Sequence, residues 1–217
     1  VFAPDESGWA TGMFSIKDTH FISCDTGLQL GYRGKENGSD NCADYALYNV
    51  VFTGCKIGVH ANTQQSVNHY WYNVCIGDCD IAASFDYGGD LRWYGGGFAR
   101  ANTVLKIRGG GPNASTFHLS GLRIEGGSGY PTMLDSLPIN GGEATVLFES
   151  CARLDVGAHT GAANPLPTFK IGAGTTLTML NCNLGAISAE IAGNGHQGAN
   201  MLLDRCHFGT TVPFVVG

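Results

Sequence analysis

The chain carries a short pattern of alternating apolar and polar residues that returns along its length. Its clearest form is residues 50–58, VVFTGCKIG, in which alternating residues precede a turn residue, a cysteine, a polar residue and an apolar residue. The alternation has the period of a β-strand. The residue before the cysteine is most often Gly, Asp, Ser or Asn, all of which suit a bend in the backbone. Each copy is therefore predicted to form a strand, a bend and a second strand.

Eight copies align on the position that holds the cysteine in the clearest form. The aligned residues are Cys24, Cys55, Cys79, Gly96, Leu122, Cys151, Cys182 and Cys206, with gaps of 31, 24, 17, 26, 29, 31 and 24 residues. These gaps are shorter than the ~40 to 45 residues of a propeller blade. They suit one turn of a solenoid that contains two or three short strands. We expect the aligned position to point inward and to stack at roughly 4.8 Å between turns, where a small apolar thiol fills a tight corner.

A second inward column is expected two residues after the first. It contains Ile57, Ile81, Phe98, Ile124, Leu184 and Phe208. Asp in place of Ile81 or Ile124 is expected to damage folding more than any loop change, because an unpaired charge would enter the core.

The fold class predicted from these columns is an all-β parallel solenoid of about eight turns, with residues 1–217 as a single domain. No long amphipathic helical stretch interrupts the pattern. The sequence begins and ends in apolar segments, whereas solenoids need polar caps for solubility. We therefore expect a fragment of a longer chain, or ends that are covered by partner subunits.

The eight cysteines are expected to be buried free thiols rather than disulfides. Six of them share the aligned position, and a continuous column offers no obvious pairing. Free thiols fit folding in a reducing cytoplasm, which is compatible with later release from the cell.

The net charge and the absence of certain sequence motifs argue against several classes of function. The net charge is −6 and the twelve basic residues are scattered, which argues against a nucleic-acid partner. No apolar run reaches 18 residues, so membrane insertion is not expected. No HExxH motif or paired Cys/His spacing indicates a metal site. Residues 193–198 match a dinucleotide fingerprint in letters only, since no βαβ unit surrounds them, and no cofactor is expected.

The turn Leu180-Asn181-Cys182-Asn183-Leu184 carries a resemblance to a known family. With the other copies, over roughly residues 12–217, it resembles the right-handed parallel β-helix of pectate-lyase-like proteins. Irregular turn lengths, abundant glycine (33 of 217 residues), inward cysteines and few charges are most similar to bacteriophage tailspikes and capsule depolymerases. The resemblance implies a homotrimer that binds or cleaves a bacterial surface polysaccharide, located on a virion tail or outside the cell.

Outward positions of the repeat supply candidate catalytic residues. In the aligned frame Asp80 and Glu125 lie two turns apart in nearby columns, with Glu149 in the same central patch. Backbones two turns apart are roughly 9.6 Å apart, and inverting glycosidases separate their two carboxyl groups by ~6.5 to 9.5 Å. We therefore expect Glu125 to act as the acid, Asp80 as the base, and Arg123 to hold substrate charge.

Aromatic and basic residues supply candidate substrate contacts. Candidates for stacking on sugar rings are Trp71, Tyr72, Tyr87 and Tyr94, with Tyr94 the best outward aromatic, while Trp93 falls at an inward position. Lys56 is a further candidate for binding substrate. A lyase would instead need a base, for which Tyr94, His118 and Lys56 are the candidates.

Three functional interpretations remain open at this point. The first is a tailspike-type protein that binds and cleaves a surface polysaccharide. The second is a β-helical appendage that only binds or serves as structure. The third is a free secreted polysaccharide lyase.

Overall fold

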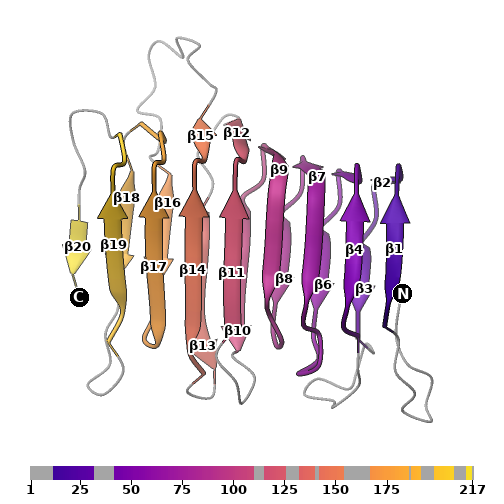
Figure 1. Ribbon diagram of the computed structural model, residues 1–217, viewed down its shortest axis with the longest axis horizontal. Coiled ribbons are helices and arrows are strands. Elements are labelled where there is room, and N and C mark those ends of the chain that lie inside the picture. Colours follow the sequence, from indigo (N-terminus) through magenta and orange to yellow (C-terminus); the bar gives the residue numbers. More distant parts are fainter. Residues whose placement is uncertain are drawn as a thin grey trace.

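The chain folds into two long parallel sheets that face each other (Figure 1). The computed structural model describes residues 12–31, 42–109, 115–125, 132–139, 142–153, 167–185, 187–191, 198–207 and 214–216. All regular elements in these residues are strands, and the strands pair with one another in parallel throughout the described part of the chain. Successive turns of the chain lie side by side from the N-terminal to the C-terminal end in Figure 1. The predicted all-β parallel solenoid is confirmed.

The first sheet has twelve strands, eight of which follow one another in chain order. These eight are β1 (Phe14–Lys17), β4 (Tyr45–Tyr48), β7 (His69–Gly77), β9 (Leu91–Ala99), β11 (Ser115–Ser120), β14 (Ala144–Glu149), β17 (Thr175–Leu180) and β19 (Asn200–Asp204). Four short strands extend its edge: β2 (His20–Ile22), β5 (Val51–Thr53), β12 (Arg123–Glu125) and β15 (Ala152–Arg153). Within the described residues the sheet therefore counts eight turns, as the repeat predicts.

The second sheet has eight strands, one from each turn. They are β3 (Thr26–Leu30), β6 (Ile57–Ala61), β8 (Ile81–Phe85), β10 (Thr103–Gly109), β13 (Thr132–Ile139), β16 (Thr168–Ile171), β18 (Ser188–Ile191) and β20 (Phe214–Val216). The core lies between the two sheets, where alternate residues of each strand point inward.

The parallel register stacks inward residues of the first sheet into continuous columns. One column runs through Leu47, Trp71, Trp93, Leu119, Phe148, Met179 and Leu203. The side chains of its members from Leu47 to Met179 are buried. Trp93 therefore points inward, as its position in the repeat predicts.

Two bends, rather than one, interrupt the first sheet. The first lies at the end of β1, β4, β11, β14, β17 and β19 and inside β7 and β9. It places Asp18, Asn49, Asn73, Gly95, Gly121, Ser150, Asn181 and Arg205 at positive φ. The second follows β2, β5, β7 and β9 and places Ser23, Gly54, Asp78 and Arg100 at positive φ. Asn and Gly tolerate the left-handed region, and Asn side chains also bond across turns: Asn73 Nδ2 donates to Asn49 Oδ1 at 3.0 Å.

The six aligned cysteines belong to two columns, one at each bend, and the single aligned column is wrong in this respect. Cys24, Cys55 and Cys79 stack after the second bend, whereas Leu122, Cys151, Cys182 and Cys206 stack after the first bend. The sequence alignment passes from one column to the other between Cys79 and Gly96, which explains its shortest gap. Gly96 stacks on Val74.

The second predicted column changes in the same way. Phe98, Ile124 and Leu184 are buried, but Ile57 and Ile81 are only half-buried because they begin strands of the second sheet. Phe208 lies outside the described residues.

All eight cysteines are free thiols. The inward thiols bond to backbone carbonyl groups near the bends: Cys182 Sγ donates to the carbonyl oxygen of Phe148 at 3.3 Å, and Cys206 Sγ to that of Met179 at 3.4 Å. Cysteine therefore contributes a small apolar volume and a donor to carbonyl oxygens of the preceding turn.

No helix in the described residues is long and apolar enough to cross a membrane.

Candidate functional site

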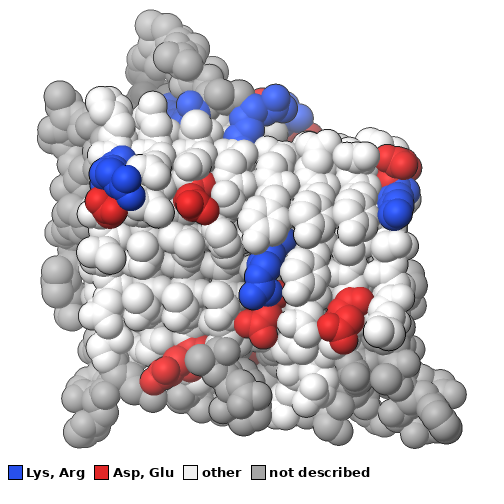
Figure 2. All heavy atoms as spheres, in the orientation of Figure 1, with Lys and Arg blue, Asp and Glu red and all other residues white. Residues whose placement is uncertain are grey.

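The outer face of the first sheet is broad and mainly uncharged, with isolated basic and acidic side chains (Figure 2). A row of outward residues crosses this face along the solenoid axis. Its register runs through Lys17, Tyr48, Tyr72, Tyr94, Ser120, Glu149, Leu180 and Asp204. We call Tyr48, Tyr72 and Tyr94 the tyrosine row.

The rings of the tyrosine row pack on one another. Tyr48 and Tyr72 are stacked at 5.1 Å with planes 6° apart, and Tyr72 and Tyr94 at 5.7 Å with planes 29° apart. Lys17 lies over the open side of Tyr48, and His118 meets Tyr94 edge to face at 5.5 Å. Because the ring faces are turned toward each other, the row offers chiefly ring edges and hydroxyl groups to a ligand. Tyr72 is the most exposed member, at 37%.

A polar cluster continues the row toward the C-terminal turns. His118 Nε2 lies 2.9 Å from Glu149 Oε2, and the Ser120 hydroxyl lies 3.4 Å from the same oxygen. The His118 and Glu149 side chains are 24% and 35% exposed, so the pair is reachable from solvent. With Tyr94 beside it, this cluster holds groups that can donate and accept protons.

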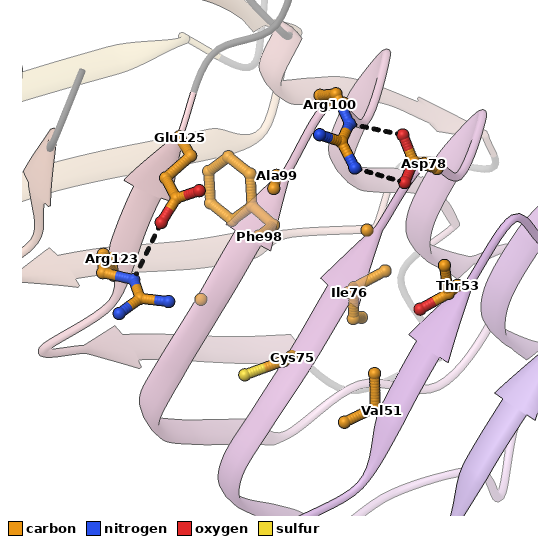
Figure 3. Close-up of a pocket in the computed structure, with 12 residues that line it drawn as sticks. Val51, Thr53, Cys75, Ile76, Asp78, Phe98, Ala99, Arg100, Arg123 and Glu125 are labelled. Atoms are coloured by element: carbon orange, nitrogen blue, oxygen red, sulfur yellow. Dashed lines mark hydrogen bonds and ion pairs between the residues drawn. The ribbon is translucent and has the colours of Figure 1, made fainter.

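A groove lies on the same strands beyond the first bend (Figure 3). It is lined by Val51, Thr53, Cys75, Ile76, Gly77, Asp78, Gly97, Phe98, Ala99, Arg100, Arg123 and Glu125, and its volume is about 180 Å³. We call it the β7–β9 groove. Tyr72 and Cys75 stand on either side of the bend in β7, as Tyr94 and Gly97 do in β9. The tyrosine row and the groove are therefore neighbours.

The groove exists because its floor lacks large side chains. The register places Val51, Cys75, Gly97 and Arg123 in one outward column, and Thr53, Gly77, Ala99 and Glu125 in the next. At Gly97 a Cβ atom would come within 2.1 Å of the backbone oxygen of Arg123, so only glycine fits. Glycine at this position lets adjacent turns approach closely while leaving space above them.

Two ion pairs border the groove, on opposite sides in Figure 3. Arg100 Nε and Nη2 lie 2.5 Å and 2.6 Å from the two carboxylate oxygens of Asp78, and Arg123 Nε lies 3.2 Å from Glu125 Oε1. The hydrogen bonds from Arg100 hold the pKa of Asp78 below its ordinary value, so this carboxylate is ionised at neutral pH. The four charges sum to zero.

The structure brings together only some of the residues singled out in the sequence. Arg123 and Glu125 line the groove, whereas Tyr94 and Glu149 belong to the neighbouring row. Their roles remain predictions.

The remaining candidates lie elsewhere. Asp80 follows the second bend, where its carboxylate accepts a hydrogen bond from Asn102 at 3.2 Å, and it does not line the groove. Lys56 pairs with Asp25 at 2.6 Å on the exposed surface. The predicted pairing of Asp80 with Glu125 rests on the sequence alignment that placed all eight repeat positions in one column. It stays a prediction.

The expectation that Trp71 offers its ring to a sugar is wrong. Trp71 is fully buried, and its indole nitrogen donates to the hydroxyl of Tyr45 at 3.2 Å. The residue lies one position before Tyr72, and alternation along the strand turns it inward.

Sequence reasoning missed Arg100 and Cys75 as groove residues. Arg100 lies at a bend in a left-handed conformation. Arginine is not a residue type from which such a conformation would be predicted. Cys75 lies outside the aligned cysteine position. The run Gly95-Gly96-Gly97 was the available signal, because a glycine in a strand marks a bulge or a close approach.

Among the described residues, no group of three or more His, Cys, Asp or Glu side chains is placed to hold a metal ion. Comparison of the chain with protein-family models, curated proteins and solved structures finds no match.

Proposed function

We propose that this chain binds a bacterial surface polysaccharide along the outer face of its first sheet, in the manner of the tailspike proteins that its repeat resembles. The observation that carries the proposal is the tyrosine row beside the β7–β9 groove. The two features combine aromatic edges, hydroxyl groups and two ion pairs on one rigid surface. Such a mixture suits a ligand made of hydroxyl groups and apolar ring faces.

The direction of the row supports a polymer rather than an isolated small molecule. Successive turns present equivalent side chains at roughly 4.8 Å along the solenoid axis. An extended polysaccharide could therefore contact one turn after another with similar chemistry. The preformed parallel sheets would keep the ordering cost of binding low on the protein side.

Binding is tested with a panel of capsular and O-antigen polysaccharides in a surface-based binding assay on the intact protein. Tyr72→Ala is expected to weaken binding of the recognised polymer about tenfold, a loss of about 1.4 kcal/mol. Leu202→Ala is the matched control, since Leu202 is 59% exposed on the same face but distant in register from the tyrosines. Equal affinity of both variants and the parent would contradict a role for the row.

Cleavage of the polymer is a second candidate function, favoured by the two carboxylates of the groove. Asp78 and Glu125 belong to turns two apart, so their backbones are separated by roughly 9.6 Å. A backbone separation of this size is compatible with the ~6.5 to 9.5 Å that separates the two carboxyl groups of inverting glycosidases. Asp78, whose pKa is lowered, would act as the base, and Glu125 would act as the acid.

The cleavage test is release of reducing ends, with ultraviolet absorbance recorded in the same samples. New reducing ends without a double-bond signal would indicate hydrolysis, and Asp78→Asn or Glu125→Gln should then lower the rate about a hundredfold or more. An equal loss in Asp80→Asn, with Asp78→Asn unchanged, would instead support the base predicted from the sequence. A double-bond signal would indicate a lyase and direct attention to His118 and Tyr94. Binding without either signal would favour the adhesive or structural interpretation.

The tailspike-type proposal also includes a homotrimer displayed on a virion tail. Sedimentation equilibrium of the protein tests the assembly directly. A trimer is the expected result, and a stable monomer that still binds polymer would instead favour a free secreted protein.

A further inference from the structure

The β7–β9 groove has features that the tyrosine row lacks, and they point to a narrower specificity. Its volume of about 180 Å³ is below the ~300 to 1,000 Å³ of sites for drug-sized ligands. A space of this size suits one sugar ring rather than a length of polymer. The groove can therefore recognise a single residue that projects from a chain, either a side branch or a chain end.

The floor of the groove suits the apolar face of such a ring. Gly97 and Ala99 contribute only backbone and one methyl group, and Val51 adds a second apolar side chain from β5. Cys75, a half-buried free thiol, lies on the same floor (Figure 3).

The walls of the groove offer donors and acceptors without net charge. Each ion pair presents guanidinium N–H groups beside carboxylate oxygens. A hydroxyl group can donate to the carboxylate and accept from the guanidinium, so two adjacent hydroxyl groups match one ion pair.

An acidic sugar meets less favourable surroundings. Both carboxylate oxygens of Asp78 accept hydrogen bonds from Arg100, and Glu125 forms an ion pair with Arg123. A ligand carboxylate would thus approach two fixed carboxylates while both arginines are already paired, and like charges at short range repel.

We infer that the β7–β9 groove binds one uncharged sugar residue between the Asp78–Arg100 and Arg123–Glu125 pairs and discriminates against uronic acids. The inference deepens the proposed function, because it names the class of sugar that the surface would select.

Cys75 provides a direct readout, because a sugar seated in the groove would cover its thiol. The full chain is treated with iodoacetamide in the presence of glucose, galactose, mannose, rhamnose, N-acetylglucosamine, glucuronic acid or galacturonic acid, and alkylation is followed by peptide mass spectrometry. At about ten times its dissociation constant, a bound neutral sugar should slow alkylation of Cys75 roughly tenfold. Cys24 and Cys206, which are half-buried elsewhere, are internal references whose rates should not change.

Two variants separate occupancy of the groove from damage to the fold. At Gly77 an added Cβ would meet only ordinary contacts, the nearest being the Ala99 backbone oxygen at 3.7 Å, and its φ is not in the left-handed region. Gly77→Leu should therefore fill the groove without backbone strain and abolish protection by neutral sugars. Glu125→Gln should leave Arg123 unpaired, so that uronic acids protect Cys75 at least as well as neutral sugars.

The outcomes distinguish this inference from the proposed function. Protection of Cys75 by at least one neutral sugar but by neither uronic acid, with the reversal in Glu125→Gln, supports the inference. Equal protection by both classes, or no protection by any sugar, overturns it, even where the polymer assay shows binding through Tyr72. Protection by a neutral sugar without binding of any polymer would uphold the groove and contradict the proposed function.

Discussion

Single residues are most tightly constrained where adjacent turns approach each other at the bends. Asn73, Ser150 and Asn181 hold left-handed conformations that most side chains avoid. Gly97 is constrained differently: its φ is not in the left-handed region, but the backbone of Arg123 leaves no room for a Cβ. Gly77, in the same groove, has that room.

The glycine pair gives a prediction with a built-in control. Gly97→Ala should destabilise the protein by about 1 to 3 kcal/mol, because the added methyl group must push the Arg123 backbone away. Gly77→Ala should leave stability nearly unchanged. Thermal unfolding by circular dichroism measures both, and similar melting temperatures for the two variants would contradict the close approach at Gly97.

His69 is a buried residue whose titration should be visible in stability. It packs edge to face against Tyr45 and Phe85, and its Nε2 donates to the carbonyl oxygen of Ser66 at 2.8 Å. Nδ1 has no hydrogen-bond partner in the described part of the chain. Burial lowers the pKa of His69 to about 4 from an ordinary 6.5.

In the unfolded chain the His69 ring therefore takes up a proton as the pH falls through about 6.5. In the folded chain the same ring stays neutral down to about pH 4. Stability should fall as pH decreases through this window, by on the order of 3 kcal/mol in total. His69→Leu, which continues the column at Leu91, should remove this part of the pH dependence. Unfolding free energies at pH 7 and pH 4.5 test it, and an unchanged difference in the variant would contradict the assignment.

At the scale of strands, the register of each sheet is fixed by patterns that differ between inner and outer faces. On the outer face of the second sheet, Lys106, Asp135, Lys170 and Glu190 form one column of alternating sign. Opposite charges on neighbouring strands favour this pairing, and a slip by one residue would turn core residues outward.

The inner face gives the prediction at this scale. Ile124 on β12 is 1% exposed, while Ile81 at the start of β8 is half-buried. Ile124→Asp should cost roughly 4 kcal/mol or more and reduce soluble yield, because it places an unpaired charge in the core. Ile81→Asp should be clearly milder. The sequence alignment places both residues in one core column, so comparable melting temperatures of the two variants would support that column over the observed arrangement.

Alternation along strands was sufficient to predict the parallel solenoid, its eight turns and the inward position of Trp93. It could not show which of two bends a cysteine marks, since both bends have the same local pattern. Only hydrogen bonds between turns, such as Asp80 N–H to the Cys55 carbonyl oxygen, separate them. The groove was equally hidden, because it depends on a missing Cβ at Gly97 and on residues from four strands.

At the scale of the whole molecule, each turn contacts its neighbours and the long face carries few charges. The net charge is −6, yet the charges around the groove cancel in pairs. Electrostatic attraction therefore contributes little to the binding proposed above. Because there is little net charge at the groove to screen, added salt should change the binding affinity only slightly.

Affinity for the recognised polysaccharide is accordingly expected to change less than about twofold between low and physiological ionic strength. Titration calorimetry at several sodium chloride concentrations measures this dependence. A steep loss of affinity with salt would mean that a charged polymer is bound, and would contradict a neutral ligand in the groove.

The connection from the first sheet to the second differs in length between the early and the late turns. In the early turns the second bend leads directly into β3, β6, β8 and β10, whereas residues 126–131 separate β12 from β13 and residues 154–167 separate β15 from β16. Among the described residues, β12 pairs with β15 and β13 pairs with β16. The stacked turns thus accept connections of different length directly after Glu125 and after Arg153 in the sequence. The solenoid is then a constant scaffold, and ligand preference can change through exchange of the connecting segments.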